Sequence, residues 1–238
     1  KAWRESDELL DDPRWDVYEV PPTSNANYAW ILNIVSKMSE NGVAGFLLAN
    51  GALSGDGAEY KIRKQLIEND LVEAIVILPQ NMFYTTNISV TLWILNKNKK
   101  ARKVNQNNVE IKYRNRENEI LFMDLRDMGI PLEKKYVQFS DDEIRRISET
   151  YHLWQKDNEE YKDIPEYSYS ANLDEIRQKD YSLVPSKYIE FENRDENINF
   201  DEKMKNLKEE FIELLKEEEA SKEDLLNVFK ELGYEIKL

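Results

Sequence analysis

The segment at residues 78–88 combines side chains that can hold a flat aromatic ligand. It reads Leu-Pro-Gln-Asn-Met-Phe-Tyr-Thr-Thr-Asn-Ile, so two adjacent aromatic residues, Phe83 and Tyr84, stand among amides and hydroxyls. An apolar ring in a loop of this kind is suited to stacking on a nucleic-acid base. Spacing alone leaves a second interpretation open, in which Phe83 packs beneath its own loop.

A second segment with possible chemistry is the tetrapeptide at residues 12–15, Asp-Pro-Arg-Trp. It superficially resembles the Asp/Asn-Pro-Pro-aromatic motif of amino-methyltransferases, in which an amide or carboxylate binds the target amine and the aromatic ring stacks on a flipped base. That motif ends a buried strand, whereas residues 8–11 are Glu-Leu-Leu-Asp, and Arg14 replaces the second proline. We therefore interpret residues 12–15 as part of a loop.

Other kinds of site find little support in the sequence. His152 is the single histidine and there is no cysteine, so no second ligand can complete a zinc site or a Cys–His pair, and we expect no metal site. The glycines at 51, 55 and 57 do not match a phosphate-binding loop. The absence of cysteine suits a cytoplasmic protein, and no apolar stretch approaches the length needed to cross a membrane.

The distribution of charge gives a hint about partners. The net charge of −14 argues against DNA binding through a broad basic face. Residues 97–116 nevertheless carry eight basic side chains against Glu110 alone, and we expect the first of them to contact a DNA backbone: Lys97, Lys99, Lys100 and Arg102. A merely solvated loop is the alternative interpretation.

Patterns of apolar residues predict an α/β fold. Runs at 43–49, 72–78, 88–95 and 120–124 predict strands, of which 43–49 should be buried on both faces. Helices are expected after Ser24 or Asn25, with Gly42 at the C-terminus, and over about 58–68. The link between 72–78 and 88–95 is too short for a helical crossover, so these strands should be antiparallel. Residues 105–118 read as a polar connection.

The second half of the sequence reads as mostly helical. Ser140 and Glu143 form a capping box ahead of one helix. Residues 161–188 are rich in tyrosine and irregular, and the tail from Phe200 is helical, with apolar residues in heptad rhythm at Met204, Leu207, Phe211 and Leu214. Ser221 is expected to cap a last short helix that ends at Gly233. We therefore divide the chain into residues 1–135 and a helical region, 136–238.

Several dispersed segments resemble the methylase subunits of type I restriction–modification systems, a family of N6-adenine DNA methyltransferases. Residues 21–31 (Pro-Pro-Thr-Ser-Asn-Ala-Asn-Tyr-Ala-Trp-Ile) are similar to the family's helix-opening signature. Residues 41–51, the Ile-Arg pair at 62–63 and the loop from Leu78 to Thr86 resemble the segments that follow. The Asp-Tyr-Ser-Leu at 180–183 with Lys-Tyr at 187–188 is similar to the characteristic tail.

The resemblance implies a fold, an activity and partners. Residues 1–135 would be the C-terminal part of a Rossmann-like catalytic domain that binds S-adenosyl-L-methionine (SAM) and methylates a flipped adenine in double-stranded DNA. Phe83 would stack on this base beside Asn81 and Tyr84, while Asn25 and Asn27 would shape the pocket. Residues 136–238 would contact the specificity subunit, in a complex with a second methylase subunit and the restriction subunit.

Two motifs of the family are missing from these residues: the Asn-Pro-Pro-Phe tetrapeptide and the acidic-x-Gly-x-Gly SAM loop. Both are expected upstream of Lys1, so we expect this chain by itself to be inactive and to leave an open sheet edge. The competing hypothesis is a non-catalytic, acidic α/β interaction module that docks a partner through its C-terminal helices. A methyltransferase with permuted motifs would need a SAM loop after Phe83, and none is visible.

Overall fold

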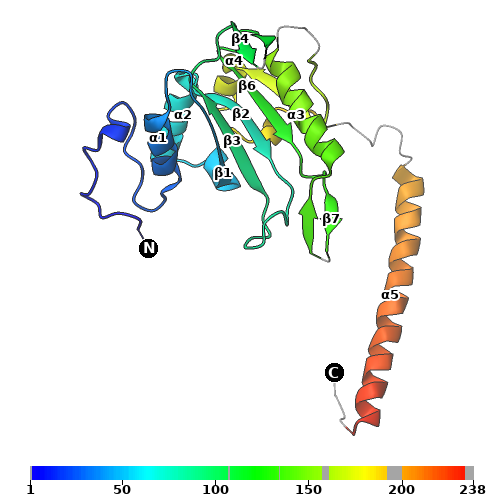
Figure 1. Ribbon diagram of the computed structural model, residues 1–238. Coiled ribbons are helices and arrows are strands. Elements are labelled where there is room, and N and C mark those ends of the chain that lie inside the picture. Colours follow the sequence, from blue (N-terminus) through cyan, green and yellow to red (C-terminus); the bar gives the residue numbers. More distant parts are fainter. Residues whose placement is uncertain (1, 107, 134, 157–160, 192–199, 234–238) are drawn as a thin grey trace. The chain divides into compact units, whose positions relative to one another are not determined.

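The computed structural model describes the whole chain except residues 1, 107, 134, 157–160, 192–199 and 234–238. The chain divides into two compact units, Lys1–Phe191 and Glu192–Leu238, and each is described by itself. Among the described residues, the first unit holds every strand and all helices but one (Figure 1). It therefore extends beyond residue 135, where the sequence analysis placed a boundary.

The first unit is built on a mixed sheet of five strands in the order β1-β3-β2-β6-β9. These strands are β1 Val43–Ala49, β2 Val72–Ile77, β3 Val90–Asn96, β6 Glu119–Asp124 and β9 Ser168–Asn172. β2 and β6 are parallel, while β3 is antiparallel to both β1 and β2. The predicted strands and the antiparallel direction of β3 are thus confirmed. β9, in the segment expected to be irregular, adds an antiparallel strand beside β6.

Helices cover the two faces of this sheet. They are α1 Asn27–Lys37, α2 Ala58–Glu68, α3 Asp141–Gln155 and α4 Leu173–Gln178, with short 3-10 turns η1 Pro13–Trp15, η2 Asn50–Leu53 and η3 Pro185–Lys187. α1 and α2 lie on one side of the sheet and α3 on the other (Figure 1). Trp93 and Phe122 point into the core under α1 and α2, whereas Val76 and Met123 belong to the core under α3. The predicted capping box of Ser140 and Glu143 opens α3.

Two details at the start of the sheet differ from expectation. β1 is an edge strand, and Val43 and Leu47 are 56% and 45% exposed, so the prediction that this strand is buried on both faces is wrong. Among the described residues it pairs with β3 alone, which leaves its other edge open. Gly42 is not left-handed, because α1 ends at Lys37 and its C-cap Met38 is already extended.

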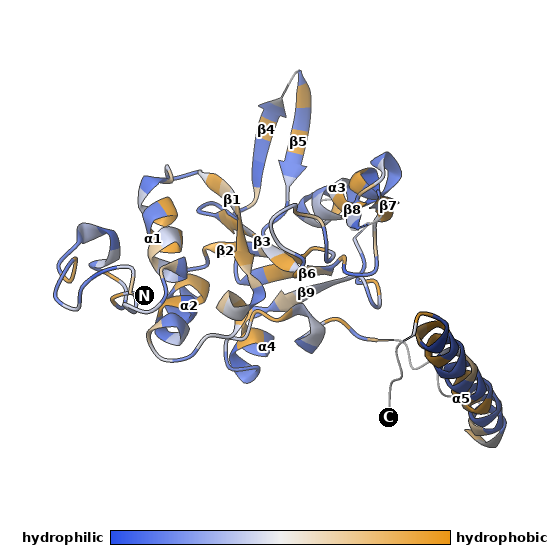
Figure 2. Cartoon of the chain, turned by 90° about the horizontal axis from the view of Figure 1, so that it is seen from below, coloured by the Kyte–Doolittle hydropathy of each residue, from blue (hydrophilic) through white to orange (hydrophobic). Residues whose placement is uncertain are grey.

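Two hairpins stand outside the main sheet. The first, β4 Arg102–Gln106 with β5 Val109–Tyr113, replaces most of the expected polar connection. Apolar and polar residues alternate along its strands, and Asn108 adopts a left-handed turn conformation. It projects away from the five-stranded sheet (Figure 2). The second consists of β7 Ile130–Leu132 and β8 Tyr136–Gln138.

The second unit contains one long helix, α5, Phe200–Glu231. The predicted helical tail is confirmed, but Ser221 does not start a new helix. The reason is that residues 216–224 contain no glycine or proline, and their glutamate, lysine and alanine side chains favour a continuous helix. Gly233 is left-handed just after its end, as predicted. Among the described residues, no helix is long and apolar enough to span a bilayer.

Candidate functional site

The loop between β2 and β3 lies at the carboxyl end of β2. Asn81 adopts a left-handed conformation with φ 61°, and the amide of Thr86 donates to the carbonyl of Phe83 to close a turn. Phe83 is half-buried and belongs to neither core cluster, while Tyr84 is 75% exposed. The ring of Tyr84 meets the edge of Tyr136 from β8 at a centroid distance of 4.8 Å. Tyr84 is therefore placed at the surface and contacted by Tyr136, whereas Phe83 is partly covered.

Asn25 and Asn27 lie at the start of α1, near the same edge of the sheet. The side-chain oxygen of Asn25 accepts from the amide of Asn27 at 2.9 Å. One residue later, the Tyr28 hydroxyl donates to the carbonyl of Ala52, in the turn that follows β1. The start of α1 is thus tied to the carboxyl end of β1. This placement agrees with a role in shaping a pocket there, which stays a prediction.

Asn50 is a polar residue at this edge that sequence reasoning missed. It directly follows β1, and its side-chain oxygen accepts from the Thr91 hydroxyl at 2.6 Å. Its amide nitrogen lies 3.5 Å from the hydroxyl of Ser89, which in turn donates to the carbonyl of Leu78. Asn50 thereby links the end of β1 to the base of the 78–88 loop. Its signal in the sequence was an amide placed directly after an apolar strand.

The basic residues lie at the other end of the strands, where β3 finishes. β3 begins beside the 78–88 loop and ends at Asn96, next to Lys97, so seven strand residues, a length of about 20 Å, separate the two sites. The structure therefore does not bring the predicted base-binding and phosphate-binding residues together. Lys100 and Arg102 remain near the surface at the foot of the β4–β5 hairpin, and the Lys97 ammonium donates to the carbonyl of Met38.

Lys99 does not fit the predicted role of a phosphate contact. It is 2% exposed, and its ammonium donates to Asp70 and to the carbonyls of Val72 and Glu119. Burial lowers the pKa of this ammonium from its ordinary value, and the ion pair with Asp70 offsets part of that effect. Lys99 thus joins β2 to β6 from within, and no surface remains through which it could reach DNA.

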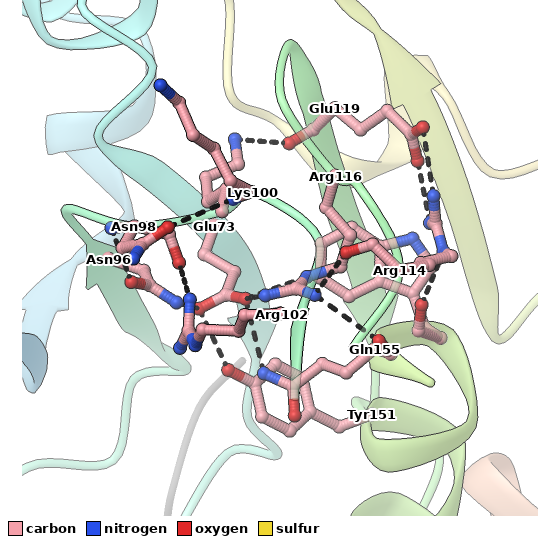
Figure 3. Close-up of polar contacts among 12 residues, drawn as sticks. Glu73, Asn96, Asn98, Lys100, Arg102, Arg114, Arg116, Glu119, Tyr151 and Gln155 are labelled. Atoms are coloured by element: carbon pink, nitrogen blue, oxygen red, sulfur yellow. Dashed lines mark hydrogen bonds and ion pairs between the residues drawn. The ribbon is translucent and has the colours of Figure 1, made fainter. Parts of the chain in front are cut away.

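Figure 3 shows a buried cluster around Glu73 that the sequence analysis also missed. The Glu73 carboxylate accepts from Arg116 at 3.1 Å, from Asn96 at 2.7 Å, from Tyr151 at 3.1 Å and from Gln155 at 3.2 Å. Glu73 and Arg116 are both fully buried. The register of β2 against β3 shifts between Val72 and Ala74, at the position of Glu73. The signal in the sequence was a single charge within an otherwise apolar strand.

Comparison with known proteins identifies the family. The profile of the family described as N-6 DNA Methylase matches residues 1–197. This chain belongs to the N-6 DNA methylase family. It is 38% identical over 239 residues to the HindI methylase subunit of a type I restriction enzyme from Haemophilus influenzae, a match that covers 98% of this chain and 49% of that protein. The MjaIX methylase subunit from Methanocaldococcus jannaschii is 33% identical over 94% of this chain and 39% of its own length.

Solved structures agree with this assignment. The methyltransferase subunit of a type I system from Streptococcus thermophilus superimposes with a TM-score of 0.66 at 27% identity, over 79% of this chain and 36% of that one. The EcoKI M protein, at 17% identity and a TM-score of 0.51, shows the same fold. This N-6 DNA methylase chain thus spans about half or less of the length of the relatives that it matches.

The remaining candidates of this N-6 DNA methylase chain take structural roles. Asp12 caps η1, and its carboxylate binds the Arg14 side chain at 2.6 Å, which holds the pKa of Asp12 at about 2. Residues 12–15 thus form a capped turn rather than a site that awaits an amine. His152 lies exposed on α3, 3.4 Å from the side-chain oxygen of Gln155.

The described residues of this N-6 DNA methylase chain do not fit a complete site for SAM. The sequence contains no acidic-x-Gly-x-Gly loop, and the glycine-containing turn after β1 is filled: Ala52 and Leu53 are buried, and Gly55 contacts Arg63 through its carbonyl. The mainly apolar hollow beside α3, lined by residues such as Leu92, Phe139 and Ile147, has no charged side chain in its lining that could bind a charged donor.

Proposed function

We propose that this chain forms the C-terminal part of a type I methylase, which transfers the methyl group of SAM to N6 of adenine in double-stranded DNA. The observation that carries the proposal is the family match over residues 1–197, which includes the exposed aromatic loop at the carboxyl edge of the sheet. The 49% coverage of the HindI subunit supports the view that the donor site belongs to the rest of such a protein.

Within this function, the 78–88 loop would bind the target base. A flipped adenine loses its stacking partners, and an aromatic ring can replace them at about 1–3 kcal/mol per base. Phe83 suits this role because it is only half-buried and belongs to neither core cluster, and Asn81 and Tyr84 flank it. Asn25 and Asn27 would shape the neighbouring wall through the start of α1. SAM, when bound, supplies the sulfonium methyl group.

The long helix α5 would form the main contact with the specificity subunit. Its apolar residues Met204, Leu207, Phe211 and Leu214 are each about half-exposed and repeat with heptad spacing. Leu225, Val228 and Leu232 continue the same heptad after a polar interval at Glu218 and Ser221. Such a stripe suits packing against another helix. A second methylase subunit and the restriction subunit would complete the assembly.

The β4–β5 hairpin would contact DNA away from the target base. Lys100 and Arg102 lie about 20 Å from the 78–88 loop along β3. Each phosphate contact contributes about 0.9 to the slope of log binding constant against log salt concentration. Lys100→Gln with Arg102→Gln in the assembled methylase should therefore reduce this slope by about 1–2. Lys61→Gln, an exposed lysine on α2, is the matched control, and an unchanged slope would argue for a merely solvated hairpin.

The central test is methyl transfer by the full-length methylase assembled with its specificity subunit. N6-methyladenine should appear in DNA on addition of SAM, and mapping of the modified positions should give one recognition sequence. This chain alone should form no product. A stable complex that never methylates DNA would overturn the proposal in favour of the non-catalytic interaction module.

A further inference from the structure

A cavity of about 600 Å³ opens on the side of the 78–88 loop that faces β6, away from β1. This volume lies within the range of small-ligand sites, roughly 300–1,000 Å³. The cavity is distinct from the surface of Phe83, which does not line it. Its lining residues come from the loop, from the segment after β6 and from the β7–β8 hairpin: Pro79, Gln80, Asn81, Arg126, Asp127, Met128, Gly129, Pro131 and Val137.

The cavity occupies the place where open α/β sheets bind ligands. β2 and β6 are parallel neighbours, and the cavity residues follow directly after Ile77 and Asp124, the last residues of these strands. Ligands of such sheets bind beyond the carboxyl ends of the strands. The position is therefore on the same edge as the proposed target-base loop and opposite the edge that holds Glu73.

Hydrogen bonds fix the walls before any ligand arrives. The amide of Val137 donates to the carbonyl of Asn81 at 3.0 Å, which joins the hairpin to the loop. The amide of Gly129 donates to the Glu143 carboxylate at 2.6 Å, which ties the segment after β6 to the cap of α3. Gly129 has φ 103°, and a Cβ there would lie 2.4 Å from Val137. This close approach requires glycine.

The lining combines unused polar groups with apolar walls. In the described part of the chain, the side chains of Gln80, Asn81 and Asp127 make no hydrogen bond, and neither does Nη1 of Arg126. The other guanidinium nitrogens of Arg126 bind Asp124 at 2.6–3.1 Å. Apolar surface comes from Pro79, Met128, Pro131 and Val137. Amides, a carboxylate and a guanidinium around an apolar slot match the mixed donors and acceptors of a base edge.

The charges of the cavity favour a neutral ligand over a phosphate. Arg126 is paired with Asp124, so its positive charge is matched, and the exposed carboxylate of Asp127, which also interacts electrostatically with Arg126, adds a negative charge. A phosphate group would meet no net positive charge here, whereas a neutral heterocycle carries no such penalty.

We propose that this cavity receives a second unpaired DNA base while the target adenine is held at Phe83; the inference rests on the proposed function. Asn81 and Phe83 are two residues apart, so their α-carbons lie within about 7 Å. Neighbouring bases on one strand are separated by about 3.4 Å. The two sites can therefore serve nucleotides of one flipped region. The second base is either the neighbour of the target or the base left unpaired opposite it.

The test uses the full-length methylase, its specificity subunit and DNA that contains the mapped recognition sequence. 2-Aminopurine at the target adenine reports target flipping, and 2-aminopurine at each adjacent position of that strand reports an unstacked neighbour. 5-Fluorodeoxyuridine opposite the target reports, by fluorine NMR, whether the orphaned base leaves the helix. We expect the target signal and one of the two second-base signals.

Variants then assign the second base to the cavity. Gln80→Ala with Asp127→Ala removes two exposed groups that make no hydrogen bond in the described structure, and should reduce the second-base signal about fivefold or more. Gln138→Ala, an exposed glutamine of β8 outside the cavity, should leave it unchanged. A target signal without any second-base signal, or a second-base signal that the double variant retains, would overturn the inference. Absence of the target signal counts separately, against the proposed function.

Discussion

Polar side chains gather along both edges of the main sheet at which its strands begin or end, and the two edges use these side chains in opposite ways. At the edge near the start of β2, Glu73 accepts hydrogen bonds from four side chains, and the ammonium of Lys99 makes three. At the carboxyl edge, Gln80, Asn81 and Asp127 make no side-chain hydrogen bond among the described residues. Glu73 and Lys99 at the first edge are satisfied internally, whereas these three side chains at the second edge remain available.

This difference separates structural charge from functional charge. A buried carboxylate persists only if partners replace its lost water, and Glu73 has such partners from β3, α3 and Arg116. A binding edge needs groups whose partners arrive with the ligand, on a backbone that is already fixed. The hydrogen bonds from Val137 to Asn81 and from Gly129 to Glu143 provide that fixed backbone. The number of basic residues in a segment does not distinguish these cases.

The largest expected effect is at Glu73. Glu73→Ala leaves Arg116 buried without its anion, and removing one partner of a buried pair costs about 3–5 kcal/mol. The free energy of unfolding of the full chain, measured by urea denaturation, should fall by this amount. Glu117→Ala, an exposed carboxylate at 3.9 Å from Lys100, should change it by less than about 0.5 kcal/mol.

A double variant makes this prediction sharper. Arg116→Met should cost less in the Glu73→Ala background than in the wild type, because the two residues share one interaction. If Glu73→Ala costs less than about 1 kcal/mol, or if the two substitutions are additive, the cluster around Glu73 does not stabilise the fold as its contacts indicate.

The next effect concerns Phe83 at the available edge. Phe83→Ala should leave the free energy of unfolding within about 1 kcal/mol of wild type, because the ring is half-buried and outside the core clusters. Loss of base stacking of about 1–3 kcal/mol should lower kcat/KM of the assembled methylase by roughly 5- to 150-fold. Phe83→Trp keeps a stacking surface and should restore most of the rate. Equal activity of the Ala and Trp variants would show that the ring packs beneath its own loop instead.

Local patterns were sufficient to predict much of the fold. The apolar runs of β2 and β3, the short link that makes them antiparallel and the capping box of α3 depend on neighbouring residues, and the structure has all three. The loop that carries Phe83 could be located for the same reason, since it joins two predictable strands. Its role came from family resemblance and stays a prediction.

Long-range contacts explain what the sequence alone did not predict. Lys99 is buried by Asp70, 29 residues earlier, and Glu73 meets Gln155, 82 residues later. The apolar composition of β1 predicts a buried strand. Its exposure depends instead on its position at the edge of the sheet, which the composition does not specify. The cavity beside Asn81 unites three segments between residues 79 and 137. No periodicity of one segment carries this information.

The smallest expected effect on stability is at an ion pair that belongs to neither edge and therefore serves as a reference for both. Glu68 of α2 binds Arg177 of α4 at 2.6 Å and accepts a hydrogen bond from the Tyr181 hydroxyl. The hydrogen bond from Arg177, and to a lesser degree the one from Tyr181, holds the pKa of Glu68 at about 2 instead of 4.5. Both charged side chains remain partly exposed, at 31% and 45%, so water screens the pair and it should contribute little to stability. Glu68→Gln should therefore destabilise the chain slightly at pH 7.

The pH dependence of this difference follows from the lowered pKa. A carboxylate with a depressed folded-state pKa stabilises the fold above its unfolded pKa and loses that contribution as the pH falls. The gap between wild type and Glu68→Gln should hold from pH 7 to about 5 and shrink between 4.5 and 2, as measured by urea unfolding at each pH. Asp174 also binds Arg177, but its side chain is 82% exposed. Asp174→Asn is therefore the control and should show a smaller gap. A gap as large as that of Glu73→Ala would mean that burial does not distinguish structural charges in this protein.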